Sequence, residues 1–296
     1  MKILLLKNSR IDKKKYDHCI EKSSFGTIYA LSWYLDIVAP GWKLFMAEDY
    51  TYVMPLPVKY KLGIIPYLIQ PVLCQQLGLF SQKEINEKIM KSFLDKIHFP
   101  FVLLQLNLGN TFPFKNTAPR SNYFLDLNKP YEELHKGYRS NCRRNLRNID
   151  TFGLVYEKNT PIDNYLNIVK TSSDHCSESV FSALKSLVQE ASFRNVAVIR
   201  SVRKENEMMA AALFLHFKNR FYYLFPVSSP IGKDYQAMRF LLDEFIKENS
   251  GTSVKLDFEG SSVASVAQFY ESFGSMLELY PRYFKTYLPF ISKTIF

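Results

Sequence analysis

The clearest pattern of hydrophobic and polar positions runs through residues 220–274. An aromatic and β-branched run from Phe221 to Val227 predicts a buried strand, and a loop rich in Ser, Pro, Ile and Gly follows it. We expect Asp234 to cap a helix whose apolar positions recur at steps of three and four. Residues 254–258 predict a second strand, and another helical pattern ends at Gly274. This order of elements places backbone N–H groups and the positive end of a helix dipole after the first strand, which suits an anion.

The rest of the chain alternates helical and strand patterns. Three antiparallel strands are expected at 196–202, 208–217 and 221–227, with a turn at 204–207. Ser81 and Glu84 predict a capping box for a helix that reaches Ile97. Other predicted helices cover 12–23, 30–38, 130–151 and 178–194, with one more starting at Thr160; other predicted strands cover a 43–59 hairpin, 64–70, 101–106, 123–127 and 276–288.

The domain boundary is expected near residues 110–121. Asn, Thr, Pro and Gly gather there without an apolar period. We therefore predict an α/β (α+β) protein with an N-terminal domain over 1–120 and a C-terminal domain over 121–296. A chain of 296 residues is long enough for two such domains, each with a core of its own.

Positive charge is concentrated in the first half of the chain. Residues 1–150 hold 22 lysines and arginines against 13 aspartates and glutamates, and residues 151–296 hold 16 against 15, which gives +9 and +1. A basic half fits a polyanionic or phosphorylated partner such as transfer RNA, a nucleotide-linked precursor or a membrane surface. Simple solubility explains the same excess equally well.

Cysteine and histidine spacing favours neither a disulfide framework nor a metal site. Cys19, Cys74, Cys142 and Cys176 include no CxxC pair, and the histidines show no ligand spacing. We expect reduced thiols and no bound metal. The apolar start is too short for a signal peptide, and the charge-free run over 62–82 carries prolines and glutamines, so we expect a cytoplasmic protein with no transmembrane segment.

Two motifs in the last part of the chain resemble a known family. The LDFEG sequence at Leu256 to Gly260 and the AxxFYxxFG pattern at Ala267 to Gly274 resemble the FemABX-like branch of GNAT-type N-acyltransferases. The basic segment from Tyr138 to Asn148 is similar to the helix that opens the second domain of such enzymes. The resemblance implies two GNAT-like domains, each with a mixed, mainly antiparallel central sheet flanked by helices.

Three residues are candidates for catalysis. In GNAT enzymes a tyrosine of the helix after the fifth strand often protonates the departing thiolate, and the resemblance places Tyr270 there. Asp257 and Glu259 flank Phe258 at a strand end, so period two would point both carboxylates to one face, where one accepts the proton of the attacking amine. The alternatives are a packed tyrosine for Tyr270 and a helix-capping role for one of the carboxylates. Asp257 is the preferred base.

The donor-binding residues are expected on the loop after residues 221–227. GNAT enzymes carry a Gly-rich pyrophosphate loop at this place, and only Gly232 and Ala237 match it here. Arg139, Arg143 and Arg147 recur at steps of four, so their guanidinium groups either bind phosphate oxygens or form a solvated helix face. The predicted donor-binding residues are Gly232, Lys233, Tyr235, Gln236, Ala237, Arg143, Arg147 and Tyr223.

The expected function is transfer of an acyl or aminoacyl group from an activated donor to a primary amine by direct attack. The donor is acyl-CoA or aminoacyl-tRNA, no cofactor is tightly bound, and the acceptor is a cell-wall precursor or a small molecule. His175 beside Asp174 and Cys176 suggests a nucleophile, but adjacent residues rarely aim at one another. A catalytically degenerate GNAT-like module that binds an anion or a partner protein is the alternative.

Overall fold

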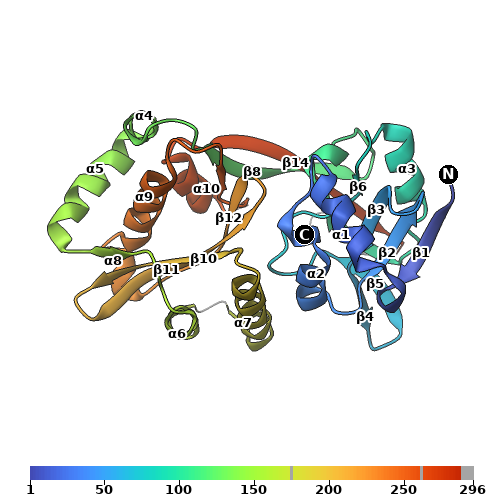
Figure 1. Cartoon of the computed structure of the whole chain (residues 1–296), viewed down its shortest axis with the longest axis horizontal. Helices are drawn as coiled ribbons and strands as arrows, with labels where there is room; N and C mark the ends of the chain where they lie inside the picture. The colour runs from blue at the N-terminus through green and yellow to red at the C-terminus, as the bar shows by residue number, and fades with distance from the viewer. Residues whose placement is uncertain (174–175, 261–262, 288–296) are drawn as a thin grey trace. The chain divides into compact units, whose positions relative to one another are not determined.

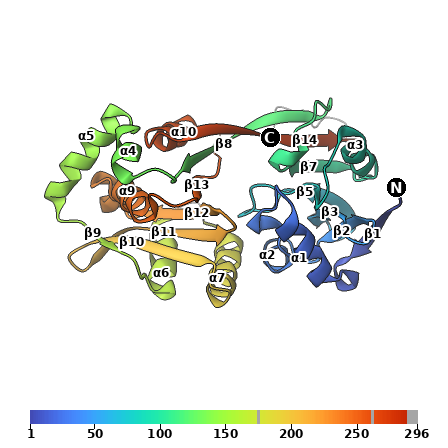
Figure 2. The ribbon, with the colours of Figure 1, turned by 45° about the horizontal axis from the view of Figure 1, so that its top comes forward.

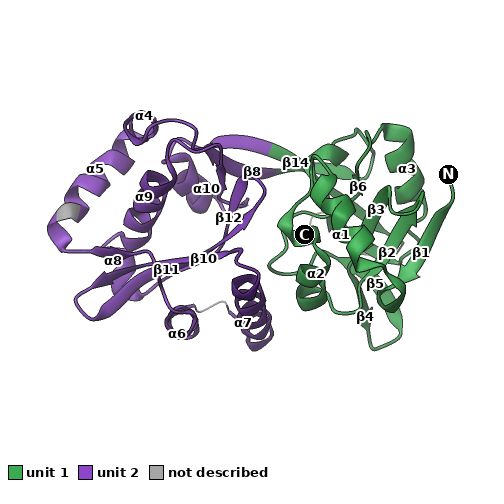
Figure 3. Cartoon of the chain, in the orientation of Figure 1, with its two compact units in different colours: residues 1–120, 279–296 green, residues 121–278 purple. Residues whose placement is uncertain are grey.

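The fold consists of two compact units (Figure 3). A computed structural model describes residues 1–173, 176–260 and 263–287. Unit 1 contains residues 1–120 and 279–296, and unit 2 contains residues 121–278. The predicted ranges of 1–120 and 121–296 place the final strand in the second domain, whereas the described residues 279–287 group with unit 1. Two strands, β8 (Thr117–Asp126) and β14 (Met276–Thr286), carry the chain across the boundary.

Unit 1 contains two sets of hydrogen-bonded strands (Figure 1). One is an antiparallel sheet in the order β1-β2-β3-β6. In the other set β4 and β5 are antiparallel, β5 and β7 parallel, and β7 and β14 antiparallel. The elements of unit 1 before β8 are β1 (Ile3–Lys7), α1 (Lys13–Lys22), α2 (Ser32–Val38), β2 (Lys43–Ala47), β3 (Tyr52–Leu56), β4 (Val58–Lys61), β5 (Ile65–Ile69), β6 (Phe80–Ser81), α3 (Glu87–Asp95) and β7 (Phe101–Gln105).

Unit 2 has one sheet in the order β8-β13-β12-β11-β10-β9. Its strands are antiparallel except for the parallel pair of β12 and β13. After β8 its elements are α4 (Tyr131–Lys136), α5 (Ser140–Ile149), β9 (Val155–Glu157), α6 (Ile162–Ser172), α7 (Glu178–Phe193), β10 (Ala197–Lys204), β11 (Glu207–Phe217), β12 (Arg220–Ser228), α8 (Pro230–Asp234), α9 (Ala237–Asn249), β13 (Lys255–Asp257) and α10 (Ala264–Glu271).

Helices cover both faces of the unit 2 sheet, α9 and α10 on one side and α6 and α7 on the other (Figure 2). Alternate residues of the central strand β11 explain how both faces are apolar. Phe214 stacks on Phe245 of α9 with ring centroids 3.8 Å apart. Leu213 and Leu215, which flank Phe214 and point to the other face of the sheet, are also fully buried. A strand that is buried on both sides reads as a continuous apolar run, as residues 208–215 do.

None of the helices in the described ranges combines the length and apolarity needed to cross a bilayer.

The predicted helix over 130–151 is wrong in one respect, because it is broken into α4 and α5. At the break, the Arg139 N–H donates to the Ser272 carbonyl oxygen, and a Cβ on Gly274 would lie 2.8 Å from the Gly137 carbonyl oxygen. The Arg143 guanidinium donates to the carbonyl oxygens of Lys136 and Tyr138. The break is therefore fixed by packing against residues that are distant in the sequence, which helical periodicity does not reveal.

Other differences concern the starts of helices. Helix α3 begins after Asn86, whose side chain accepts from the Ile89 N–H, so the predicted capping box of Ser81 and Glu84 is wrong. The expected loop after β12 is the short helix α8, and α9 begins after Gln236 instead of Asp234. Strands β1 and β9 were not predicted. β1 is an apolar run that we interpreted only as too short for a signal peptide.

Candidate functional site where two parallel strands separate

The parallel strands β12 and β13 separate near the centre of the unit 2 sheet. Their pairing ends at Tyr222 and Asp257, while β12 continues to Ser228 alongside β11. The Phe258 N–H instead donates to the Tyr123 carbonyl oxygen of β8. A bulge in the β11–β12 register, beside Leu213, lies just past the point of separation. Bulges are frequent next to active sites because they redirect the strand. We call this place the strand divergence, defined by Tyr222 and Asp257.

Aromatic rings pack beside the strand divergence. Tyr270 of α10 stacks on Phe258 at 5.0 Å between ring centroids and meets Tyr223 edge-on at 6.2 Å. Tyr270 is 8% exposed, and its hydroxyl has no hydrogen-bond partner among the described residues. Burial raises the pKa of Tyr270, and the carboxylates of Glu259 and Asp257 raise it further. The phenol therefore keeps its proton at neutral pH, as a proton donor requires.

Asp257 is the most buried charged residue of this region, with 1% of its surface exposed. Its Oδ2 lies 2.6 Å from Nη1 of Arg220, and its Oδ1 accepts from the Glu259 N–H at 2.9 Å. Burial raises the pKa of Asp257, while Arg220 and the Glu259 N–H act in the opposite direction. Burial alone would lower the pKa of Arg220, but the Asp257 carboxylate raises it. Both oxygens of the carboxylate are engaged, which favours a positioning role for Asp257 over that of a base.

Glu259 differs from Asp257 in backbone and exposure. Strand β13 ends at Asp257, and Glu259 has a φ of 56°. The prediction that strand alternation points both carboxylates to one face is therefore wrong, because the alternation stops before Glu259. Both carboxylates nevertheless act on the pKa of Tyr270, so all three predicted catalytic residues lie in one neighbourhood. Glu259 is half-buried, which makes it the more accessible carboxylate.

Sequence reasoning missed the residues that hold Asp257 in place. Arg220 also lies 3.5 Å from Glu278, and the Asn122 side chain donates to Glu278 at 3.4 Å. Arg220 is separated from Asp257 by 37 residues, and it is a lone cation at the start of an apolar strand. The contact depends on the register of the parallel pair, in which Arg220 and Tyr222 lie opposite Lys255 and Asp257, and the sequence of neither strand shows that register.

The predicted loop of donor-binding residues is a compact helical turn. A Cβ on Gly232 would lie 1.9 Å from the Met209 carbonyl oxygen, and the Gly232 N–H donates to Ser229 Oγ at 2.9 Å. Gly232 is therefore required for packing of α8 on β11, and its buried backbone does not match the predicted contact with phosphate. Lys233 is exposed beside it, and Ala237 is fully buried.

The residues just before α9 are more accessible. Gln236 is exposed and precedes α9 with a φ of 56°, a conformation that non-glycine residues seldom adopt. The Tyr235 ring meets the Phe152 ring at 5.1 Å and lies under the Lys204 ammonium group at 4.2 Å from the ring centroid. Lys204, Lys233 and the N-terminal end of α9 bring positive charge to this corner, and the exposed Asp234 brings one negative charge. We call it the α9 corner, defined by Lys204, Lys233, Tyr235 and Gln236.

The three spaced arginines do not act alike. Arg139 precedes α5 and forms a 2.5 Å ion pair with Glu271, and Arg143 is bound to backbone carbonyls at the break between α4 and α5. Arg147 and the neighbouring Arg144 are exposed and form no ion pair with a described residue. Two of the three guanidinium groups are therefore already bound within the chain, and Arg147 is the accessible member of the predicted set. Arg144 and Arg147 are the accessible cations of α5.

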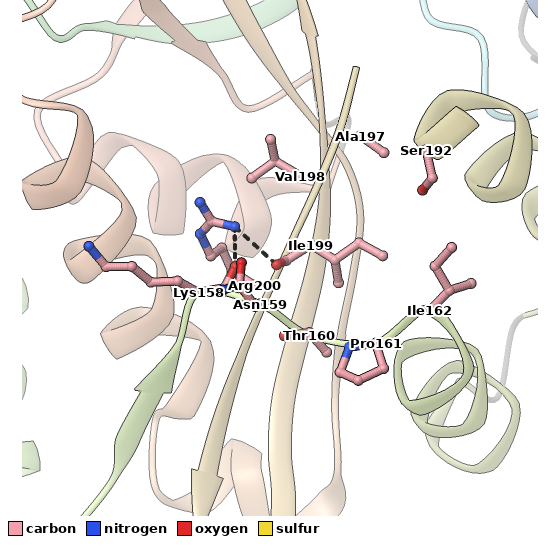
Figure 4. A pocket seen from close by; sticks show the side chains of 10 residues that line it. All are labelled: Lys158, Asn159, Thr160, Pro161, Ile162, Ser192, Ala197, Val198, Ile199 and Arg200. Atoms are coloured by element: carbon pink, nitrogen blue, oxygen red, sulfur yellow. Dashed lines mark hydrogen bonds between the residues drawn. The ribbon is translucent and has the colours of Figure 1, made fainter. Parts of the chain in front are cut away.

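A hollow lies at the edge of the unit 2 sheet (Figure 4). It has a volume of about 500 Å³, and its lining comes from the segment before α6, the end of α7 and the first half of β10. The Arg200 guanidinium donates to the Ile199 carbonyl oxygen at 3.2 Å. It also donates two hydrogen bonds to the Glu248 carboxylate of α9, at 2.8 and 3.1 Å. Two cations line the hollow, the exposed Lys158 and Arg200, and Arg200 is already paired with Glu248, so this hollow is a weaker candidate for an anionic ligand. No predicted residue lines it.

The remaining sequence candidates give no further site. Asp174 and His175 lie outside the described residues, and the half-buried Cys176 has a pKa raised by burial. Among the residues that the structure describes, no cluster of three or more His, Cys, Asp or Glu side chains has the geometry to hold a metal ion.

Comparisons with known proteins identify the fold. No protein-family model matches the sequence, and no curated protein matches it. Among solved structures, FemX is similar with a TM-score of 0.65 and 13% identity over 95% of this chain and 97% of that chain. A Bacteroides thetaiotaomicron protein of unknown function has a TM-score of 0.58 and 12% identity over 93% and 97% of the two chains. L-PGS from Bacillus licheniformis has a TM-score of 0.56 and 12% identity over 94% and 93%.

These similarities agree with the architecture described above, in which mixed and largely antiparallel sheets carry helices on their faces. The predicted α/β class is confirmed, and so is the resemblance at the level of the fold. The chain has the fold of FemX and of L-PGS from Bacillus licheniformis.

Proposed function

We propose that unit 2 transfers an acyl or aminoacyl group from an activated donor to a primary amine. The observation that carries this proposal is the strand divergence, where the parallel pair ends at Tyr222 and Asp257 and β12 continues to Ser228. Separation of the two strands leaves the β13-facing side of residues 223–228 without a strand partner in β13. An extended donor fits there with its carbonyl beside Tyr270, and an aligned reacting group gains much of its rate from position alone.

The anionic end of the donor would bind at the α9 corner. Lys233 is exposed there, and the 13-residue helix α9 adds the positive end of its dipole. Tyr235 offers a ring edge for an adenine or ribose, and its contact with Phe152 connects this corner to the end of α5, which carries Arg147. Phosphate groups would therefore meet cations from two directions.

The proposed reaction needs one base and one acid. The amine nitrogen attacks the carbonyl carbon, a C–N bond forms, and the C–S or C–O bond to the leaving group breaks. Glu259 accepts the proton that the amine loses, and Tyr270 gives its proton to the departing thiolate or alkoxide. Asp257 fixes Glu259 through its hydrogen bond to the Glu259 N–H. Direct attack requires no covalent enzyme intermediate.

The structure favours aminoacyl-tRNA over acyl-CoA as the donor. In α8 the N–H groups of Gly232, Lys233 and Tyr235 are already bonded within the chain, so few remain for a pyrophosphate. The exposed arginines of α5 also suit the repeated phosphates of an RNA backbone. The acceptor is a primary amine, on a cell-wall precursor or on a small molecule.

The first experiment is isothermal calorimetry with acetyl-coenzyme A, followed by a gel shift with charged tRNA on the same sample. A salt-sensitive tRNA shift without coenzyme A binding supports an aminoacyl-tRNA donor, and saturable coenzyme A binding supports a thioester donor. Transfer of the labelled group from the donor that binds to a panel of amines is then measured. Silence in both binding assays would contradict the proposal.

Tyr270→Phe tests the acid. We expect turnover to fall by roughly 100-fold with little change in donor binding, because the acid acts only as the leaving group departs. Tyr123→Phe is the matched control, since this ring lies 6.3 Å from that of Tyr270 and also loses only a hydroxyl. Equal losses in both variants would assign Tyr270 a packing role.

A non-catalytic module is the second candidate. It is favoured by the engagement of both Asp257 oxygens and by the burial of Tyr223 and Tyr270. This candidate predicts saturable donor binding with no transfer to any amine and with no effect of Tyr270→Phe.

A further inference from the structure

The hairpin of β4 and β5 lies in unit 1 (Figure 1), and the side chains at its tip are apolar and exposed. Leu62 is 82% exposed and Ile64 is 76% exposed, and Tyr60 and Ile65 beside them are also largely exposed. Exposed single apolar residues are common, but a contiguous set at the end of a projecting turn marks an interaction surface. We call residues 59–65 the hairpin tip.

The turn at this tip contradicts the usual turn chemistry. The Ile64 N–H donates to the Lys61 carbonyl oxygen, and the two residues between them, Leu62 and Gly63, have φ values of 53° and 74°. Turns with two positive φ values favour Asn, Asp and Gly, because a branched side chain is strained in this region. Leu62 therefore neither stabilises the turn nor contributes to the core. A residue that breaks a local rule without a structural gain points to a function.

Positive charge surrounds the tip. Lys59 and Lys61 are exposed and form no ion pair with a described residue, and Lys43 lies 5.8 Å from the centre of the Tyr60 ring. The sequence from Thr51 to Lys83 contains no Asp or Glu. Unit 1 as a whole holds 19 lysines and arginines against 9 aspartates and glutamates, whereas unit 2 holds 19 against 19. The tip therefore combines apolar side chains with an unbalanced positive field.

Lysine on an edge strand argues against a second copy of the chain as the partner. β4 is the edge strand of its set and pairs with β5 on one side. Exposed lysines on such an edge oppose pairing with another strand, because they bring like charges together. An anionic lipid surface has the opposite requirements. It attracts lysines at the headgroup level and accepts apolar side chains just below it.

We infer that the hairpin tip inserts into the interfacial region of an anionic lipid bilayer. Leu62 and Ile64 enter the boundary between headgroups and acyl chains, and Lys59, Lys61 and Lys43 remain at the level of the anionic headgroups. Tyr60 suits the same interface because its ring is apolar and its hydroxyl polar. This role is independent of the transfer reaction proposed for unit 2.

The test is co-sedimentation of the full chain with phosphatidylcholine vesicles that contain roughly one third phosphatidylserine. We expect saturable binding that weakens as salt is added, and little binding to phosphatidylcholine alone. Leu62→Asn is the sharpest variant, because it creates the Asn-Gly pair that this turn prefers and so does not weaken the hairpin. Vesicle binding should fall roughly tenfold, since the variant lacks the leucine side chain that the proposed insertion buries in the bilayer. Phe193→Ser, which removes another side chain that is 82% exposed, should leave binding unchanged.

Charge variants separate specific insertion from general attraction. Lys59→Gln with Lys61→Gln should weaken binding by roughly fivefold for each lysine at low salt. Lys88→Gln with Lys185→Gln removes the same charge from exposed helix positions and should have a smaller effect. Equal effects of the two pairs, or unchanged binding by Leu62→Asn, would overturn the inference. So would concentration-dependent dimerisation without lipid that Leu62→Asn abolishes, because the occupant would then be a second copy.

Discussion

Glu248 shows how one charged residue can belong to the buried side of a helix. The sequence places Glu248 among the apolar positions of α9, where a carboxylate is unexpected. In the structure its Oε2 accepts from the Tyr156 hydroxyl at 2.7 Å, and both of its oxygens contact Arg200. Burial opposes ionisation, but hydrogen bonds from Arg200 and Tyr156 lower the pKa of Glu248 below its ordinary value.

Glu248→Gln should therefore destabilise the protein in a pH-dependent way. Because the folded protein lowers the pKa of Glu248, its stabilisation is complete above the unfolded pKa and is lost as the pH falls through the folded pKa. We expect a loss of about 2 kcal/mol in the free energy of unfolding at neutral pH, and a smaller loss at about pH 3. Urea denaturation at both pH values measures this difference.

Glu244→Gln is the control for Glu248→Gln. Glu244 lies on the same helix and pairs with Lys247 at 3.4 Å, but the Lys247 side chain is 55% exposed. An exposed pair contributes little, so this variant should be nearly neutral at both pH values. If Glu248→Gln lost the same free energy at both pH values, its effect would come from packing and not from charge.

At this scale the sequence predicts neighbourhoods better than contacts. Tyr223, Asp257, Glu259 and Tyr270 do come together, because the order of strands and helices determines where each strand ends. The partner of Asp257 was not predicted, since Arg220 becomes its neighbour only through the register of two strands far apart in the sequence. Register depends on the whole sheet and is not visible in either strand alone.

Among the elements, α8 depends on one glycine. Gly232→Ala would place a Cβ 1.9 Å from the Met209 carbonyl oxygen, and neither backbone can move without separating α8 from β11. We expect a loss of about 3 kcal/mol or more in the free energy of unfolding, measured by urea denaturation. A Gly251→Ala control separates this clash from the cost of losing a glycine, since Gly251 has open space around it. Unchanged stability with weaker donor binding would instead restore Gly232 to the predicted binding loop.

Gly251 itself has a φ of 74°, so its replacement by alanine carries a backbone cost of about 1 kcal/mol. The excess loss in Gly232→Ala over this control measures the steric clash. The comparison also explains which elements the sequence can predict. Periodicity is sufficient for β11, β12 and α9, whereas α8 and the break between α4 and α5 depend on close backbone contacts with distant segments.

For the whole molecule, the division of charge between the units is informative. The sequence shows an excess of +9 in residues 1–150, but the basic residues 129–147 belong to unit 2, where carboxylates balance them. The entire net charge of +10 therefore falls on unit 1, because unit 2 holds equal numbers of cations and anions. A broad field on unit 1 suits an extended anionic surface, whereas the local cations of α5 and the α9 corner suit a single ligand.

This division predicts that the two anion-binding surfaces respond to different substitutions. Arg144→Ala with Arg147→Ala should weaken charged-tRNA binding and retain binding to anionic vesicles. For tRNA, the slope of the logarithm of the binding constant against the logarithm of the salt concentration should become shallower by roughly 1.5. Leu62→Asn should instead weaken vesicle binding and retain charged-tRNA binding. Arg143→Ala is the structural control, because its guanidinium is bound to the carbonyl oxygens of Lys136 and Tyr138 and its loss should lower stability. If each variant weakened tRNA and vesicle binding by the same factor, one shared surface would replace the two separate ones.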